Sequence, residues 1–69
     1  MPVAHINILQ GHSKETLKNV IRDVSQVIVD VLSAPKDRLE VWVTEIDPDL
    51  WGIEGQPASE VLKVKPRGQ

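Results

Sequence analysis

The strongest structural signal in this chain is the stretch SKETLKNVIRDVSQVIVDVL, residues 13–32. Apolar side chains recur in it at steps of three and four residues, which predicts one amphipathic helix with a broad apolar stripe. Ser13 is placed to cap the amino end, and Glu15 lies near the positive end of the helix dipole. Pro35 ends the helix, because the residue before a proline is displaced from the helical region. The stripe consists of Leu17, Val20, Ile21, Val24, Val27, Ile28, Val31 and Leu32.

Two segments with alternating apolar residues flank the helix and predict β-strands. They cover residues 3–9 and 39–44. A strand, a long helix and a second strand predict a β-α-β unit with parallel strands and a right-handed crossover. The expected fold class is therefore α+β, in which the helix stripe covers one sheet face, formed by Ala4, Ile6, Ile8, Leu39, Val41 and Val43.

The opposite face of this sheet is left uncovered. It carries Val3, Leu9 and Trp42 among polar neighbours, a composition typical of an interface between chains. A chain of 69 residues without cysteine has no disulfide to support a small core. We therefore expect the protein to oligomerise.

The remainder of the chain is rich in proline and glycine. In DPDLWGIEGQPAS, residues 47–59, we expect a turn, a short extended piece around Trp51–Glu54 and another turn at Gly55–Pro57, which together form a short C-terminal hairpin or extended segment. Residues 62–69 form a basic tail, expected to be a solvated arm. The whole of 1–69 is expected to be a single domain.

Composition and charge exclude several classes of function. The net charge is −2 with no basic stripe, so nucleic acid is not an expected partner. No apolar run approaches the roughly 20 residues that span a bilayer, and no leader precedes the first strand, so we expect a cytoplasmic protein without a membrane partner. His5 and His12 are too few and too differently placed for a zinc site, and no metal is expected.

Pro2 directly follows the start methionine and directly precedes the first strand. As the first residue of an edge strand, a proline costs nothing, because its missing N–H has no partner to lose. Loss of Met1 would instead expose a secondary amine, a base that no internal residue can supply. Composition and periodicity leave both interpretations open.

The order of these features resembles the 4-oxalocrotonate tautomerase family. The similarity runs from Pro2 to about Val61. It rests on Pro2 after Met1, a strand to Leu9, Gly11 and Ser13 opening an amphipathic helix, Ala34-Pro35 at its end, a strand closing on Thr44-Glu45, and the segment Trp51-Gly52-Ile53.

The resemblance implies β-α-β subunits that assemble as a hexamer, a trimer of dimers, with sites at subunit junctions. It also implies that Met1 is removed and that Pro2 becomes the catalytic base. An amine whose pKa lies near the working pH can take a proton from one atom and return it to a carbon in the same pocket. A secondary amine can also form an iminium with an aldehyde. No cofactor is expected.

The chain departs from the family at two positions that bind substrate. The family uses two arginines to hold a dicarboxylate, and here the first place is occupied by His12 and the second by Glu40. Neither the His12 imidazole nor the Glu40 carboxylate can bind a substrate carboxylate with two parallel hydrogen bonds, as an arginine does. A muconate-type diacid is therefore not the expected substrate. Arg38, two residues before Glu40 and on the same side of the strand by alternation, could replace the lost cation, but we favour a surface residue near the start of the strand.

Four further residues are considered as site candidates. Trp51 corresponds to the aromatic wall of the family's pocket, and Leu9 is assigned with it to substrate binding. His5 is expected at an interface or surface. Glu54 falls one residue away from the place where some dehalogenating relatives have a water-activating glutamate.

Three functions remain at this point. The first is a Pro2-dependent tautomerase or isomerase acting on a small enol or α-keto acid. The second is hydration or dehalogenation of a small unsaturated acid, with Glu40 or Glu54 activating water. The third is a non-catalytic or structural subunit of a mixed hexamer, with the arginines supplied by a different chain.

Overall fold

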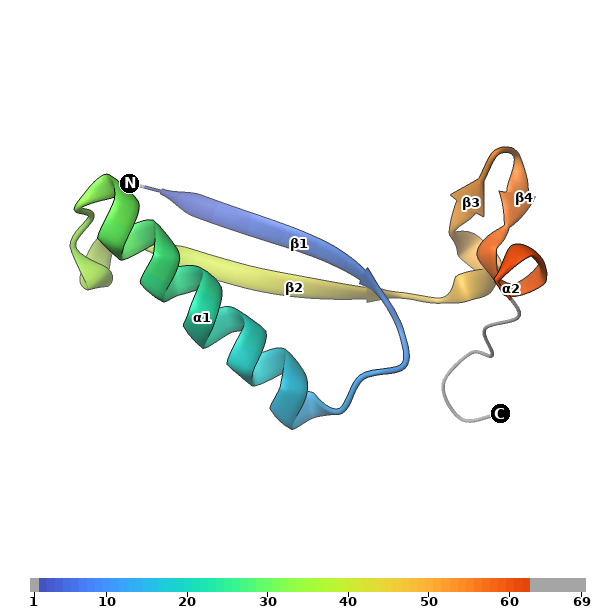
Figure 1. Ribbon diagram of the computed structural model, residues 1–69, viewed down its shortest axis with the longest axis horizontal. Coiled ribbons are helices and arrows are strands. Elements are labelled where there is room, and N and C mark those ends of the chain that lie inside the picture. The colour runs from blue at the N-terminus through green and yellow to red at the C-terminus, as the bar shows by residue number, and fades with distance from the viewer. Residues whose placement is uncertain (1, 63–69) are drawn as a thin grey trace. The chain divides into compact units, whose positions relative to one another are not determined.

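The computed structural model describes residues 2–62 of the chain. They divide into two compact units, one made of residues 2–6 and 12–43 and the other of residues 7–11 and 44–62. The elements, labelled in Figure 1, are β1 (Val3–Leu9), α1 (Lys14–Leu32), the 3-10 helix η1 (Lys36–Arg38), β2 (Glu40–Ile46), the 3-10 helix η2 (Pro48–Leu50), β3 (Gly52–Ile53), β4 (Gln56–Pro57) and α2 (Ala58–Val61).

Strands β1 and β2 pair in parallel and form a two-stranded sheet. At one end the Glu40 N–H donates to the Pro2 carbonyl oxygen at 3.2 Å, and at the other the Gln10 N–H donates to the Ile46 carbonyl oxygen at 3.0 Å. Both bonds fit one parallel register, in which Val3 lies beside Glu40. The predicted β-α-β unit with parallel strands is therefore confirmed, and the second strand begins one residue later and ends two residues later than expected.

Helix α1 begins where the sequence predicts. Ser13 is the N-cap, and its hydroxyl oxygen accepts a hydrogen bond from the Thr16 N–H at 3.1 Å. The helix ends at Ser33, which adopts the left-handed conformation with φ 53°. In the first unit α1 runs along one face of the paired strands (Figure 1), and Leu17 is its buried residue.

Part of the predicted apolar stripe is not covered. Val27, Val31 and Leu32 are 59%, 74% and 62% exposed, so the expectation that the whole stripe packs on the sheet is wrong for these three. Val27 lies at the flank of the stripe, and Val31 and Leu32 belong to the last turn of α1. Two strands are too narrow to cover a stripe of this width over 19 residues of helix.

The strand faces in the first unit follow the predicted alternation. Ala4, Ile6, Val41 and Val43 are half-buried on the side of α1. Their neighbours along each strand point away from it and are exposed: Val3, His5, Glu40 and Trp42. The uncovered apolar face expected from the sequence is present.

The second unit contains the short C-terminal hairpin expected from the sequence, but its turn lies at a different place than predicted. Gly52 pairs with Pro57 and Ile53 with Gln56 in an antiparallel ladder. The expected turn at Gly55–Pro57 is therefore wrong, because Gln56 and Pro57 form the return strand. The turn itself is Glu54-Gly55, with φ of 50° and 83°, the positive values that a two-residue type I′ turn requires.

Few residues are fully buried in the described part of the chain: Leu17, Pro48 and Ala58. The short helix α2, which the sequence analysis did not predict, follows the hairpin directly. Of the basic tail 62–69, only Leu62 belongs to the described residues, and the rest lies outside them. Within residues 2–62, neither helix combines the length and apolar character needed to cross a membrane.

Candidate active site

Pro2 lies immediately before β1 and is half-buried. Its carbonyl oxygen accepts the 3.2 Å hydrogen bond from the Glu40 N–H, so the proline is held beside the first residue of β2. A proline has no N–H to place in the ladder, so its nitrogen is left for other chemistry. With Met1 attached this nitrogen is an amide and not basic; without Met1 it is a secondary amine.

The backbone before β2 places Arg38 differently from the prediction. Arg38 is the last residue of η1, and its N–H donates to the Pro35 carbonyl oxygen at 3.0 Å. The alternation argument that put it on the same strand face as Glu40 is therefore wrong, because alternation holds only within a strand. Arg38 and Glu40 are both exposed, two residues apart at the end of the sheet that holds Pro2.

His12 lies at the other end of the first unit. It follows Gly11, whose φ of 137° suits glycine, and precedes the Ser13 cap of α1. Pro2 precedes the first residue of β1, whereas His12 follows its last, and seven residues of strand lie between them. At about 3.3 Å per residue, this strand separates the two by roughly 23 Å. One chain therefore does not bring His12 to Pro2.

Leu9 and Trp51 belong to the second unit. Leu9 is the last residue of β1 and is half-buried. Trp51 is the C-cap of η2, also half-buried, and its carbonyl oxygen accepts a hydrogen bond from the Ala58 N–H at 2.7 Å. This bond ties the start of the hairpin to the start of α2 and fixes the backbone of the tryptophan.

Two further candidates have clear structural positions. His5 packs its ring against Trp42 on the exposed sheet face, with ring centroids 5.0 Å apart and an interplanar angle of 31°. Such a tilted pair is a favourable aromatic contact. Glu54 is exposed in the single chain and occupies the first turn position of the hairpin.

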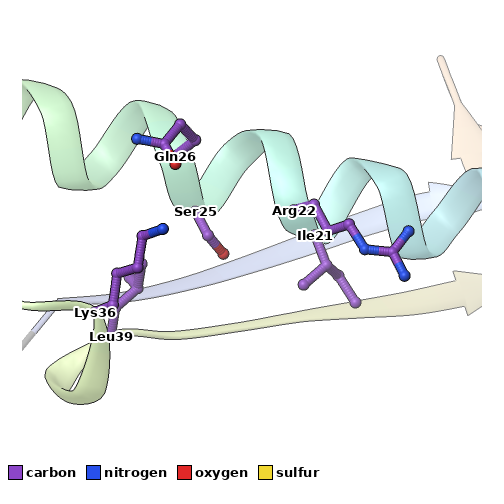
Figure 2. Close-up of a pocket in the computed structure, with 6 residues that line it drawn as sticks. All are labelled: Ile21, Arg22, Ser25, Gln26, Lys36 and Leu39. Atoms are coloured by element: carbon purple, nitrogen blue, oxygen red, sulfur yellow. The ribbon is translucent and has the colours of Figure 1, made fainter.

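The sequence analysis missed an open pocket in the first unit, on the α1 side of the sheet. It has a volume of about 390 Å³ (Figure 2), and its lining consists of Ile21, Arg22, Ser25, Gln26, Lys36 and Leu39. The available sequence signal was weak: a serine, Ser25, follows Ile21 of the apolar stripe by one helical turn. Among residues 2–62, no three histidine or acidic side chains are grouped so that they could hold a metal ion.

Comparison with known proteins places this geometry in a family. The family model described as tautomerase enzyme matches residues 2–61. The 2-hydroxymuconate tautomerase of Pseudomonas sp. (strain CF600) is 39% identical over 63 residues, covering 91% of this chain and 100% of that protein.

Solved structures agree with the fold. A 4-oxalocrotonate tautomerase isozyme from Methylibium petroleiphilum has a TM-score of 0.83 at 32% identity, covering 87% of this chain and 97% of that one. A heterohexamer 4-oxalocrotonate tautomerase from Chloroflexus aurantiacus J-10-fl has a TM-score of 0.83 at 23% identity, covering 88% and 98%, and supports the fold alone. The resemblance found from the sequence is confirmed. The chain belongs to the tautomerase family of enzymes, as a 4-oxalocrotonate tautomerase-like member.

Proposed function

We propose that this protein is a tautomerase that uses Pro2, after removal of Met1, as the general base on a small enol or α-keto acid. The observation that carries the proposal is the position of Pro2. It is the first residue of the family match and is held at the end of the sheet by the Glu40 N–H. Small second residues generally permit removal of the initiator methionine, which would convert the Pro2 nitrogen into an amine.

The proposed chemistry moves one proton. The Pro2 amine takes the proton from the enol hydroxyl, and the resulting ammonium returns it to the carbon that becomes saturated. No redox step and no cofactor are needed, because the electrons of the double bond shift within the substrate. Charge that develops on the substrate oxygen requires hydrogen-bond donors, for which we propose His12, Arg38 and the indole N–H of Trp51.

These donors need not come from the same chain as Pro2. Within the first unit His12 lies at the far end of β1 from Pro2. A pocket with both residues therefore needs two copies of the chain, and we propose that the site forms at a subunit junction of a homo-hexamer. The Chloroflexus relative is a heterohexamer. A mixed hexamer is the alternative assembly for this chain, because a second chain could supply arginines that are absent at positions 12 and 40.

The substrate we propose carries one carboxylate rather than two. Relatives are named for 2-hydroxymuconate, a dicarboxylate. Here the exposed Glu40 carboxylate would repel a second substrate carboxylate, and His12 does not provide a guanidinium fork.

The test is turnover of phenylenolpyruvate, a monocarboxylate enol. The Met-free protein should catalyse its ketonisation, and Pro2→Ala should lose at least about tenfold in kcat/KM, because a general base contributes on the order of a hundredfold or more. Some activity should remain because an alanine at the amino terminus would still offer a primary amine. Asp23→Ala, on the exposed face of α1, is the control. Equal activity of all three proteins would show that Pro2 is only the start of a strand.

A further inference from the structure

The pocket between α1 and η1 has the features of a binding site. Its volume of about 390 Å³ lies within the range of small-molecule sites. Four of its lining side chains come from α1 and two come from η1 and the residue after it. All six belong to the first unit, so the pocket is formed within a single compact unit of the chain.

The charge of the lining is positive. Arg22 and Lys36 are cations, and none of the six lining residues is acidic. Figure 2 shows Lys36 rising from its loop toward α1, while Ser25 projects from α1 in the opposite sense, so that their polar ends converge on the gap. A convergent ammonium and hydroxyl can both donate to an anion.

Neighbouring side chains on α1 hydrogen-bond to the other two polar side chains of the lining, Arg22 and Gln26. The Arg22 guanidinium donates to the Asn19 amide oxygen at 2.7 Å and lies 3.6 Å from a Glu15 carboxylate oxygen. The Gln26 amide nitrogen donates to an Asp30 carboxylate oxygen at 2.9 Å. Because Glu15 offsets part of the Arg22 charge, Lys36 is the main source of positive potential in the pocket.

The remaining lining is apolar. Ile21 and Leu39 are half-buried and form the side of the pocket next to the sheet. We propose that this pocket binds a small amphipathic carboxylate, with its carboxylate between Lys36 and Ser25 and its apolar body against Ile21 and Leu39. Inorganic phosphate would satisfy the cations but leave the apolar surface exposed.

This site is separate from the one proposed at Pro2. Neither Pro2 nor Glu40 lines the pocket. Leu39 is half-buried on the α1 side, whereas Glu40, the next residue, is exposed. A ligand here bridges α1 and η1, so it should raise the thermal stability of the protein through its preference for the folded state.

The experiment is an NMR titration of the nitrogen-15-labelled protein with benzoate, benzyl alcohol and inorganic phosphate. Benzoate should shift the backbone amides of Ile21, Ser25 and Leu39 in a saturable manner. Benzyl alcohol and phosphate should each bind more weakly. Absence of benzoate shifts at these amides would overturn the proposal, as would phosphate binding as tight as benzoate.

Paired variants test the role of the cation. Lys36→Met should weaken benzoate binding by about two- to fivefold, the range expected for one exposed ion pair. Lys18→Met, which removes an exposed cation of α1 outside the pocket, should leave the affinity unchanged. Equal effects of the two variants would contradict the proposal. The readout is binding at α1 and η1 rather than turnover, so it stands or falls independently of Pro2 catalysis.

Discussion

The hydrogen bond between the Glu40 N–H and the Pro2 carbonyl oxygen puts a carboxylate side chain at the end of the sheet that holds the proposed base. The side chain of Glu40 is exposed, and Arg38 lies two residues before it on η1. At this scale, the charge of position 40 should affect both the choice of substrate and the ionisation of the Pro2 amine.

The first prediction concerns the substrate. The double variant His12→Arg/Glu40→Arg should raise kcat/KM for 2-hydroxymuconate by about tenfold or more, because a charge-assisted hydrogen bond contributes about 1.5–3 kcal/mol. Turnover of phenylenolpyruvate should change much less. Glu60→Arg, which makes on α2 the charge change that Glu40→Arg makes on β2, is the control. If the ratio of kcat/KM for 2-hydroxymuconate to kcat/KM for phenylenolpyruvate is unchanged, pocket shape and not charge excludes the diacid.

The second prediction concerns pH. Only the neutral form of the Pro2 amine can accept the substrate proton. The kcat/KM of the Met-free protein should therefore rise with pH through one ionisation. A free α-amine has a pKa near ~8, and a nearby carboxylate raises the pKa of an amine by favouring its charged form. Glu40→Gln should therefore move the midpoint of the profile to lower pH. A midpoint that stays in place would show that the Glu40 carboxylate does not face the amine.

At the scale of elements, local periodicity explains what could be predicted. Ser13 caps α1 and the strands alternate as expected, because these signals depend only on neighbouring residues. The position of the hairpin turn was harder to predict, since the turn begins with Glu54, a residue that rarely adopts a positive φ. The partial exposure of the α1 stripe depends on the width of the sheet, which no helical pattern reveals.

The third prediction follows from that turn. Glu54→Asn should stabilise the protein by about 1 kcal/mol, because asparagine tolerates the left-handed conformation that costs other residues about that much. Urea unfolding at a fixed protein concentration measures the change. Glu54→Gln removes the same charge without the conformational preference and should be close to wild type. Equal stability of both variants would argue that the turn is not strained.

For the whole molecule, the described residues include more exposed large apolar side chains than buried ones. Large apolar side chains are exposed in both units: Val3, Val27, Val31, Leu32, Trp42, Leu50, Val61 and Leu62. Only Leu17, Pro48 and Ala58 are buried within residues 2–62. Patches of this kind mark association surfaces. The candidate site was predictable from sequence only as a set of residues, because β1 separates Pro2 from His12 within one chain and the second copy that we propose to bring them together cannot be located from the sequence.

The fourth prediction is therefore an oligomer. Sedimentation velocity at micromolar concentration should show an assembly, with a hexamer as the expected size. Trp42→Glu should shift the distribution to smaller species, because it puts a charge on the uncovered sheet face. Lys18→Glu, on α1, should not. A wild-type protein that sediments only as a monomer would contradict both the assembly and a site shared between subunits.

We propose that the free amine of Pro2 is the catalytic base. Cleaving the peptide bond between Met1 and Pro2 tests this directly. The same Met1-retaining preparation is assayed with phenylenolpyruvate before and after aminopeptidase treatment, with intact mass recording the loss of Met1. We expect no ketonisation above background while Met1 is attached, and activity that rises in proportion to the Met-free fraction, because only then is the Pro2 nitrogen basic. Activity that is the same before and after complete removal of Met1 would contradict this proposal.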